Sequence, residues 1–286
     1  MIIVDKGESP LILCLPDSGT TIPPAVSKRL NATGRLQTDV SWRLEQVLDL
    51  NGETGATVIR STASRYVIDV DHAPEPVLEP GSEVLPALCP LKTLDGKEFY
   101  VPDEEPGPTE IEQRGLLFYD PFHDALRREV ERLRKQHDRI VVLICRSIRS
   151  RIKGFIDEPL PVFSLGTLDG KACDPALVTA FSNALNGKND MTVEVKDVYP
   201  NSYILETYGR PDIGVNAMTV LLAQRTYLRH ESPPFEPDRK GIARMKDLFG
   251  EVSDQIVAWN NGEAPALPAE ELAQPEQEEA AAAVSD

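Results

Sequence analysis

The hydrophobic pattern of the chain contains two short, continuous apolar runs. LILCL (residues 11–15) and RIVVLIC (139–145) have the length of strands, and apart from Arg139 they carry no polar position. A strand that is apolar on both faces needs cover on both, which is typical of a parallel sheet between helices. We therefore predict that both runs are interior strands of one mainly parallel sheet.

Helical spacing is clearest in YDPFHDALRREVERLRKQHD (119–138). Apolar residues recur there every three or four positions from Phe122 to Leu133. Pro121 is suited to the first helical position and Asp120 to the position before it. The pattern predicts a helix that begins at this Asp-Pro pair.

The remaining segments alternate between strand and helix patterns. Helices are predicted at 39–50, 178–185 and 239–260, strands at 56–61, 65–70, 191–198 and 217–228, and a long loop at 74–113. Strands that alternate with helices indicate an α/β fold, with helices covering the sheet.

The composition changes after Trp259. Residues 262–286 contain seven acidic residues and no basic one. Such a segment cannot bury enough apolar surface to offset its ordering entropy, so we predict one α/β domain over 1–261 and a disordered acidic tail over 262–286.

Truncation after Asn261 is therefore expected to leave the melting temperature of the domain unchanged. Thermal unfolding of the full and truncated chains, compared side by side, measures this. A fall of many degrees on truncation would show that the tail contributes to the fold.

Charge and composition exclude several classes of function. A net charge of −16 argues against nucleic-acid binding, which needs a basic face. No apolar run approaches the roughly 20 residues that span a bilayer. The start MIIVDKGESP lacks the features of a signal peptide, and the four cysteines form no C-x-x-C pair. We expect a cytoplasmic protein with reduced thiols and no membrane contact.

Polar residues follow both apolar runs, where the carboxyl ends of parallel strands bring side chains to one edge of a sheet. Asp17 follows the first run within PDSG, and Arg146 and Arg149 follow the second within RSIRSRIKG. The stretch TASRYVIDVDHAP adds four candidates: Arg65, Asp69, Asp71 and His72.

Four stretches carry a resemblance to a known family. SRYVIDVD, DPFHDALRREVERL, VFSLGTLDGKACDPAL and YGRPDIGVNAMTVLLAQRTYL resemble, in order, motifs of the N-formylglutamate amidohydrolases, the zinc deformylases of histidine breakdown. The resemblance runs from about Leu11 to about Phe235. It implies a phosphorylase/hydrolase-like fold of the kind found in zinc carboxypeptidases, and hydrolysis of an amide by a zinc-bound water.

The chain departs from the family at the positions that the resemblance assigns to the metal and the base. Asp17 and Arg146 stand where the family has histidine ligands, Ser41 where it has an aspartate ligand, and Leu221 where it has the glutamate general base. Zinc needs deprotonated N, O or S ligands, and arginine is always protonated. The resemblance thus predicts that the family's zinc, and with it the catalytic residues, has been lost.

Asp17 and Arg146 have three possible arrangements. They can form a buried ion pair through charge-assisted hydrogen bonds, with Ser41 close by, and this is the arrangement that we predict. They can instead both be solvated. A third arrangement has Asp17, Asp39 and Asp71 around Mg²⁺ or Ca²⁺, which Arg146 would repel.

Other positions keep the family's residue types. Arg65, Arg149 and Tyr208 match it and are predicted to bind a small carboxylate. Each of the two arginines can equally brace a loop against Asp69 or a carbonyl at the end of the sheet. His123 is predicted to be a buried structural residue, and Cys173 a packed residue at a helix start.

These observations support two hypotheses of different classes. The first is an amidohydrolase-like pseudoenzyme that binds a small acidic ligand or a protein partner. The alternative is an active amidohydrolase acting on N-formyl-L-glutamate or a related N-acyl amino acid. The zinc content of the purified protein distinguishes them.

Overall fold

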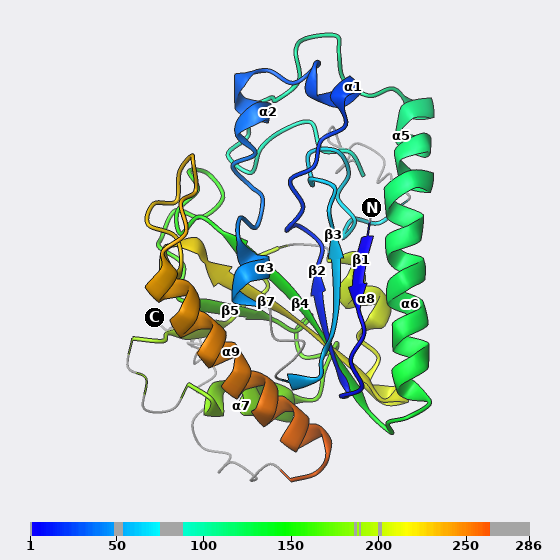
Figure 1. The fold of residues 1–286 in the computed structure, drawn as a ribbon, viewed down its shortest axis with the longest axis vertical. Helices are drawn as coiled ribbons and strands as arrows, with labels where there is room; N and C mark the ends of the chain where they lie inside the picture. Colours follow the sequence, from blue (N-terminus) through cyan, green and yellow to red (C-terminus); the bar gives the residue numbers. More distant parts are fainter. Residues whose placement is uncertain are drawn as a thin grey trace, which may run out of the picture.

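The computed structural model describes residues 2–48, 54–74, 88–185, 188, 190–199 and 202–263. Within them the chain forms one seven-stranded sheet in the order β1-β3-β2-β4-β7-β5-β6 (Figure 1). The strands are β1 (Ile2–Asp5), β2 (Leu11–Leu15), β3 (Thr57–Ser61), β4 (Ile140–Ile148), β5 (Phe163–Gly166), β6 (Val193–Val195) and β7 (Val215–Ala223).

The four central strands of the sheet are parallel. β2 pairs with β3 and β4, and β4 pairs with β7, all in the parallel sense. The strands next to this central group run in the opposite direction: β1 is antiparallel to β3, and β5 is antiparallel to β7. Every residue of β2 and β4 is buried. The predicted α/β fold with these two runs as interior strands is confirmed.

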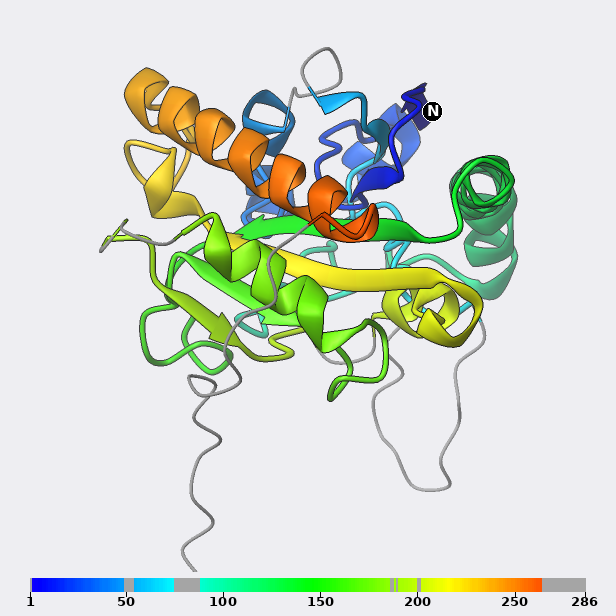
Figure 2. The same cartoon turned by 90° about the horizontal axis from the view of Figure 1, so that it is seen from below.

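Helices cover both faces of the sheet. They are α1 (Pro24–Ser27), α2 (Ala32–Leu36), α3 (Leu44–Val47), α5 (Pro108–Arg114), α6 (Asp120–Arg134), α7 (Pro175–Asn183), α8 (Tyr203–Tyr208) and α9 (Arg239–Asn260), with short η1 (Gly115–Tyr119), η2 (Pro211–Ile213) and η3 (Gln224–Thr226). One apolar core joins the sheet to α3, α7 and α9, and a second joins its other face to α6 and α8. Figure 2 shows α9 and α8 on opposite sides of β4 and β7. No helix among the described residues is long and apolar enough to cross a membrane.

The predicted helix is α6, which begins at Asp120 as predicted, but it continues a helical segment that starts at Pro108, so Asp120 is not a cap at a free helix end. α5, the π-helix η1 and α6 follow one another without a break, and Asp120 has helical backbone angles (φ −57°, ψ −46°). A π-helical turn before Pro121 accommodates a residue that lacks an amide N–H. The loop predicted for 74–113 therefore ends at Gly107, and its residues 75–87 lie outside the described part.

Two other predicted elements differ from the structure. Residues 65–70 form turns and not a strand, because their apolar side chains are divided between two cores: Tyr66 and Val67 pack in one, Ile68 and Val70 in the other. The helix predicted for 39–50 is reduced to α3 within the described residues, since Arg43 adopts a left-handed conformation just before it. Of the predicted tail, residues from 264 onward lie outside the described part.

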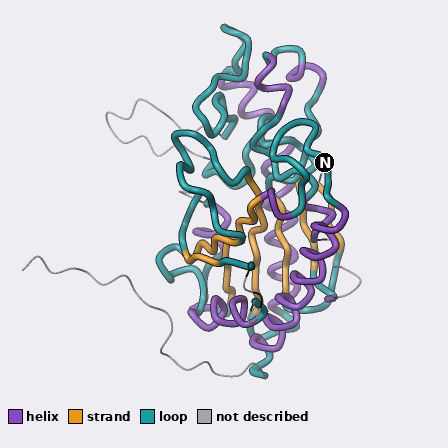
Figure 3. Tube along the Cα trace, turned by 90° about the vertical axis from the view of Figure 1, so that its left-hand side faces the viewer, coloured by secondary structure: helices purple, strands orange, loops and turns teal. Residues whose placement is uncertain are grey.

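The parallel strands place their carboxyl ends at one edge of the sheet. The segments that follow β2 and β3 meet the end of β4 at this edge. Figure 3 shows loops gathered beyond one end of the strands. The predicted site residues lie mainly in this region.

Candidate functional site

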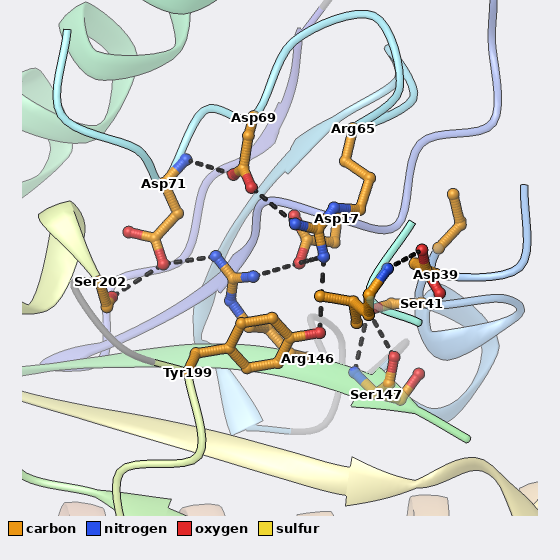
Figure 4. Close-up of polar contacts among 12 residues, drawn as sticks. Asp17, Asp39, Ser41, Arg65, Asp69, Asp71, Arg146, Ser147, Tyr199 and Ser202 are labelled. Carbon is orange, nitrogen blue, oxygen red and sulfur yellow. Dashed lines mark hydrogen bonds and ion pairs between the residues drawn. The ribbon is translucent and has the colours of Figure 1, made fainter. Parts of the chain in front are cut away.

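Arg146 joins two carboxylates at the carboxyl edge of the sheet. Its Nη1–H donates to Asp17 Oδ2 and its Nη2–H to Asp71 Oδ2 (Figure 4). Asp17 follows β2, and Arg146 lies within the neighbouring strand β4 and not in the loop after it. The three residues are only 1–4% exposed. The predicted Asp17–Arg146 ion pair is confirmed, and Asp71 is an additional partner.

Arg65 and Asp69 extend this cluster. Arg65 Nη2 donates to Asp69 Oδ2 at 2.8 Å, and Arg65 Nη1 lies 4.0 Å from Asp17 Oδ2. The Asp71 amide N–H donates to Asp69 Oδ1 at 3.0 Å. We call these five residues, Asp17, Arg65, Asp69, Asp71 and Arg146, the ion network. It holds three carboxylates against two guanidiniums and thus carries one excess negative charge when all are ionised.

Asp71 also connects the ion network to the start of α8. Its carboxylate accepts a hydrogen bond from Ser202 Oγ at 2.8 Å and one from the Ile204 amide at 2.7 Å. His123, which belongs to α6, places its Nε2 2.8 Å from the Val70 carbonyl oxygen. The turn that bears Asp71 is therefore held from both α6 and α8.

Tyr199 covers the guanidiniums of the ion network. Its ring centroid lies 4.6 Å from Arg146 Cζ and 5.8 Å from Arg65 Cζ. Arg65 Nη1 donates to the Tyr199 hydroxyl at 3.5 Å. The electron-rich ring face stabilises the two cations and limits access of water to them (Figure 4).

Burial dominates the protonation of the acidic residues. It raises the pKa of Asp71 to about 6, against the opposing effects of Arg146 and of the Ile204 and Ser202 hydrogen bonds. Burial also raises the pKa of Asp17, whose Oδ1 has no hydrogen-bond partner among the described residues. For Asp69, burial is outweighed by Arg65, Arg146 and the Asp71 amide, and the pKa falls below its ordinary value. One proton within the ion network removes its excess charge.

Ser41 and Leu221 lie at the same place, as the resemblance implied. The Ser41 amide donates to the Asp17 carbonyl at 2.9 Å, and its hydroxyl accepts from the Ser147 amide at 2.9 Å. Leu221 pairs with Arg146 in the register of β4 and β7. Its side chain packs in an apolar cluster of Ile148, Ile152, Ile156, Leu160, Leu221 and Ala223. The four replaced positions thus come together in three dimensions.

Asp39 belongs to a separate ion pair. Its Oδ1 accepts from Arg149 Nη2 at 2.9 Å, and its Oδ2 accepts from the Tyr66 hydroxyl and the Leu94 amide, each at 2.9 Å. Asp39 therefore does not join Asp17 and Asp71 around a common point. Among the residues that the structure describes, no group of three acidic, histidine or cysteine side chains could hold a metal ion. The arrangement of three aspartates around a hard cation does not fit this geometry.

The structure does not bring the three predicted carboxylate-binding residues together. Arg65 belongs to the ion network and is hydrogen-bonded to Asp69. Arg149 is hydrogen-bonded to Asp39 in the neighbouring pair. Tyr208 packs against His123 on the α6 and α8 side, where its hydroxyl donates to the His123 carbonyl at 3.4 Å. His123 is half-buried there, and Cys173 is buried in the core beside α7.

Two contributors to the site were not predicted from the sequence. Tyr199 lies in a stretch without a recognisable motif, so no local signal marks it. Ser202 does carry a signal, because a serine before an apolar run is a preferred N-cap, and its hydroxyl accepts from the Leu205 amide at 3.3 Å.

Comparison with known proteins identifies the family of the chain. A model of the family described as N-formylglutamate amidohydrolase matches residues 9–228. The chain belongs to this family. N-formylglutamate deformylases of Pseudomonas aeruginosa and Pseudomonas putida are 28% and 29% identical to it. Each alignment covers 89% of this chain, and 95% and 94% of the respective relatives.

Two solved structures have a fold similar to that of this chain over most of its length. An N-formylglutamate amidohydrolase from Ralstonia eutropha has a TM-score of 0.77 at 22% identity, covering 91% of this chain and 98% of its own. The gene product Atu2144 from Agrobacterium tumefaciens has a TM-score of 0.70 at 18% identity, with 91% and 96% covered. These similarities show that the described fold is the family's fold.

Proposed function

We propose that this family member has exchanged metal-dependent hydrolysis for a binding function. One observation carries the proposal. The guanidinium of Arg146 binds Asp17 and Asp71 at the position that the resemblance assigns to a metal ligand. A guanidinium offers no lone pair to zinc and repels a second cation. A metal would have to displace two buried, charge-assisted hydrogen bonds to enter.

The neighbouring positions support the same proposal. Leu221, opposite Arg146 in the sheet, is aliphatic and transfers no proton. The Ser41 hydroxyl is already hydrogen-bonded to the backbone of Ser147. Neither a third ligand nor a base is present at the positions where the family is expected to have them.

The proposed ligand is a small acidic molecule, with a protein as the alternative partner. The matching arginines Arg65 and Arg149 suit a carboxylate. Each would first have to release its internal partner, Asp69 or Asp39. The four cysteines are unpaired, which supports placing this function in a reducing compartment such as the cytoplasm.

An active deformylase remains the second candidate function, and it has its own supporting observation. The similar Pseudomonas proteins are named N-formylglutamate deformylases and align with 89% of this chain. On this alternative, residues other than those at the replaced positions would hold the reacting groups.

Zinc content and turnover separate the two candidates. We expect the full chain, produced with zinc in the medium, to retain far less than one zinc per molecule and not to hydrolyse N-formyl-L-glutamate above the uncatalysed rate. The Pseudomonas aeruginosa relative is the positive control. Near-stoichiometric zinc together with turnover that a chelator abolishes would establish the hydrolase instead.

The variant D17H/R146H is the matched test of the replaced ligands. We expect it to bind more zinc than the wild-type chain, because two imidazoles replace an ion pair at one point. It should still give no turnover, since Ser41 and Leu221 are unchanged. Hydrolysis by this variant would show that the missing ligand and base are dispensable.

A further inference from the structure

A polar groove lies on the α3 side of the sheet, apart from the ion network. It consists of two cavities of about 220 and 350 Å³ that share Glu45 and Arg60. The first is lined by residues 18–21, 42–43, 45 and 60–62, and the second by Asp5, Leu15, Glu45, Gln46, Leu48, Val58 and Arg60. No member of the ion network lines either cavity. We call the two cavities together the α3 groove.

Two arginines converge on the first cavity of the α3 groove. Arg43 and Arg60 both line it, and neither forms an ion pair with any residue in the described ranges. The arginines of the ion network, in contrast, are each paired with a carboxylate. In a chain of net charge −16, two cations in one cavity that form no ion pair within the described residues are available for an external anion.

The backbone and the side chain of Arg43 are both unusual. Its backbone is left-handed (φ 62°, ψ 7°), a conformation that costs free energy for any residue with a side chain. Its Nε is enclosed without a hydrogen-bond partner among the described residues. Its guanidinium lies 6.0 Å from the Trp42 ring centroid, and Trp42 is itself stacked on Phe235 at 4.9 Å. An oxyanion at the guanidinium would supply acceptors that the described residues do not.

The rest of the first cavity's lining is mostly polar and includes the end of β3. Ser18, Thr20 and Thr21, which carry hydroxyl groups, are among the lining residues. Gly19 lies between them, because a Cβ at this position would come within 2.3 Å of the Ala63 carbonyl oxygen. Hydroxyl donors around two guanidiniums suit the oxygens of a carboxylate or a phosphate.

The size and charge of the first cavity restrict the ligand to a small molecule. Glu45 offsets one of the two positive charges, which leaves a single net positive charge for the anion. A volume of about 220 Å³ lies below the range of pockets for drug-sized ligands. We propose that the first cavity of the α3 groove is a binding site for a small oxyanion, held by Arg43 and Arg60.

Titration calorimetry on the full chain tests this proposal, with inorganic phosphate and glutarate as probes. We expect saturable binding of at least one probe, weakened roughly tenfold or more in R43Q and in R60Q, because each removes a charge-assisted contact. R128Q is the matched control, since Arg128 is an exposed arginine on α6, on the other face of the sheet. Binding of phosphate alone points to a phosphate ester as the natural ligand, and binding of glutarate alone to a carboxylic acid.

R149Q distinguishes this groove from the predicted carboxylate contacts at Arg65 and Arg149. Binding that survives in R149Q and fails in R43Q and R60Q supports the α3 groove. Loss in R149Q with retention in R43Q and R60Q overturns it, as does the absence of saturable binding by either probe.

Chemical modification of the wild-type chain gives an independent readout that does not depend on how the variants fold. Phenylglyoxal labels accessible arginines, and peptide mass mapping locates the label. Bound probe is expected to protect Arg43 and Arg60 and to leave Arg128 unprotected. Equal labelling with and without the probe overturns the proposal. Zinc content and deformylase turnover do not bear on this result, so it stands or falls apart from the proposed function.

Discussion

Replacement of Arg146 by methionine is expected to lower the free energy of unfolding by about 3–5 kcal/mol at neutral pH. Asp17 and Asp71 are 1% and 4% exposed, and both would lose their shared cation. Methionine fills much of the volume of arginine, so the lower free energy of unfolding would come mainly from the uncompensated charges and not from a cavity. Urea unfolding of wild-type and R146M proteins measures it.

The triple variant D17N/D71N/R146M should recover much of this loss. It removes both carboxylate charges together with the guanidinium, and a buried ionic group replaced as a whole costs far less than a broken one. R128M on α6 is the surface control and should stay within about 0.5 kcal/mol of wild type. An R146M protein as stable as wild type, or a triple variant less stable than R146M, would contradict the importance of the ion network.

Stability is expected to fall as the pH rises from about 4 to about 7, because the folded protein holds a proton on Asp71 more tightly than the unfolded chain does. The pKa of Asp71 is about 6 in the folded state, against 3.8 for an aspartate in water. The stabilisation from this proton is fully present below the unfolded pKa and is lost as pH rises through the folded pKa. The full change corresponds to about 3 kcal/mol.

The variant D71N isolates this contribution, since asparagine resembles the protonated carboxyl group and does not titrate. The difference in unfolding free energy between wild type and D71N should shift by about 2–3 kcal/mol in favour of D71N between pH 4 and 7. Asp69, whose pKa is lowered, acts in the opposite sense only at more acidic pH. A difference that is constant across this range would show that Asp71 stays ionised in the folded protein.

The sequence by itself determined the elements whose signals are local. The continuous apolar runs at 11–15 and 140–145 required burial on both faces and became β2 and β4. The amphipathic period at 239–260 matches α9 residue for residue. The Asp17–Arg146 pair was predicted from the resemblance, because both positions match histidines that the family is expected to place on one metal, although Arg146 lies within β4 and not in the loop after it.

Only the tertiary structure decided which other residues contact the Asp17–Arg146 pair. The local pattern of residues 65–70 is that of a strand, but these residues form turns, and their apolar side chains are divided between two cores. This course of the chain brings Asp71 to Arg146. Tyr199 and Ser202 arrive from the segment between β6 and α8, far away in the sequence. Tyr208, although it matches the family, packs against His123 between α6 and α8 and, within the described part of the chain, forms no hydrogen bond with Arg65 or Arg149. Periodicity sets which residues form an element, but the approach of distant segments depends on the packing of whole elements, which no local pattern encodes.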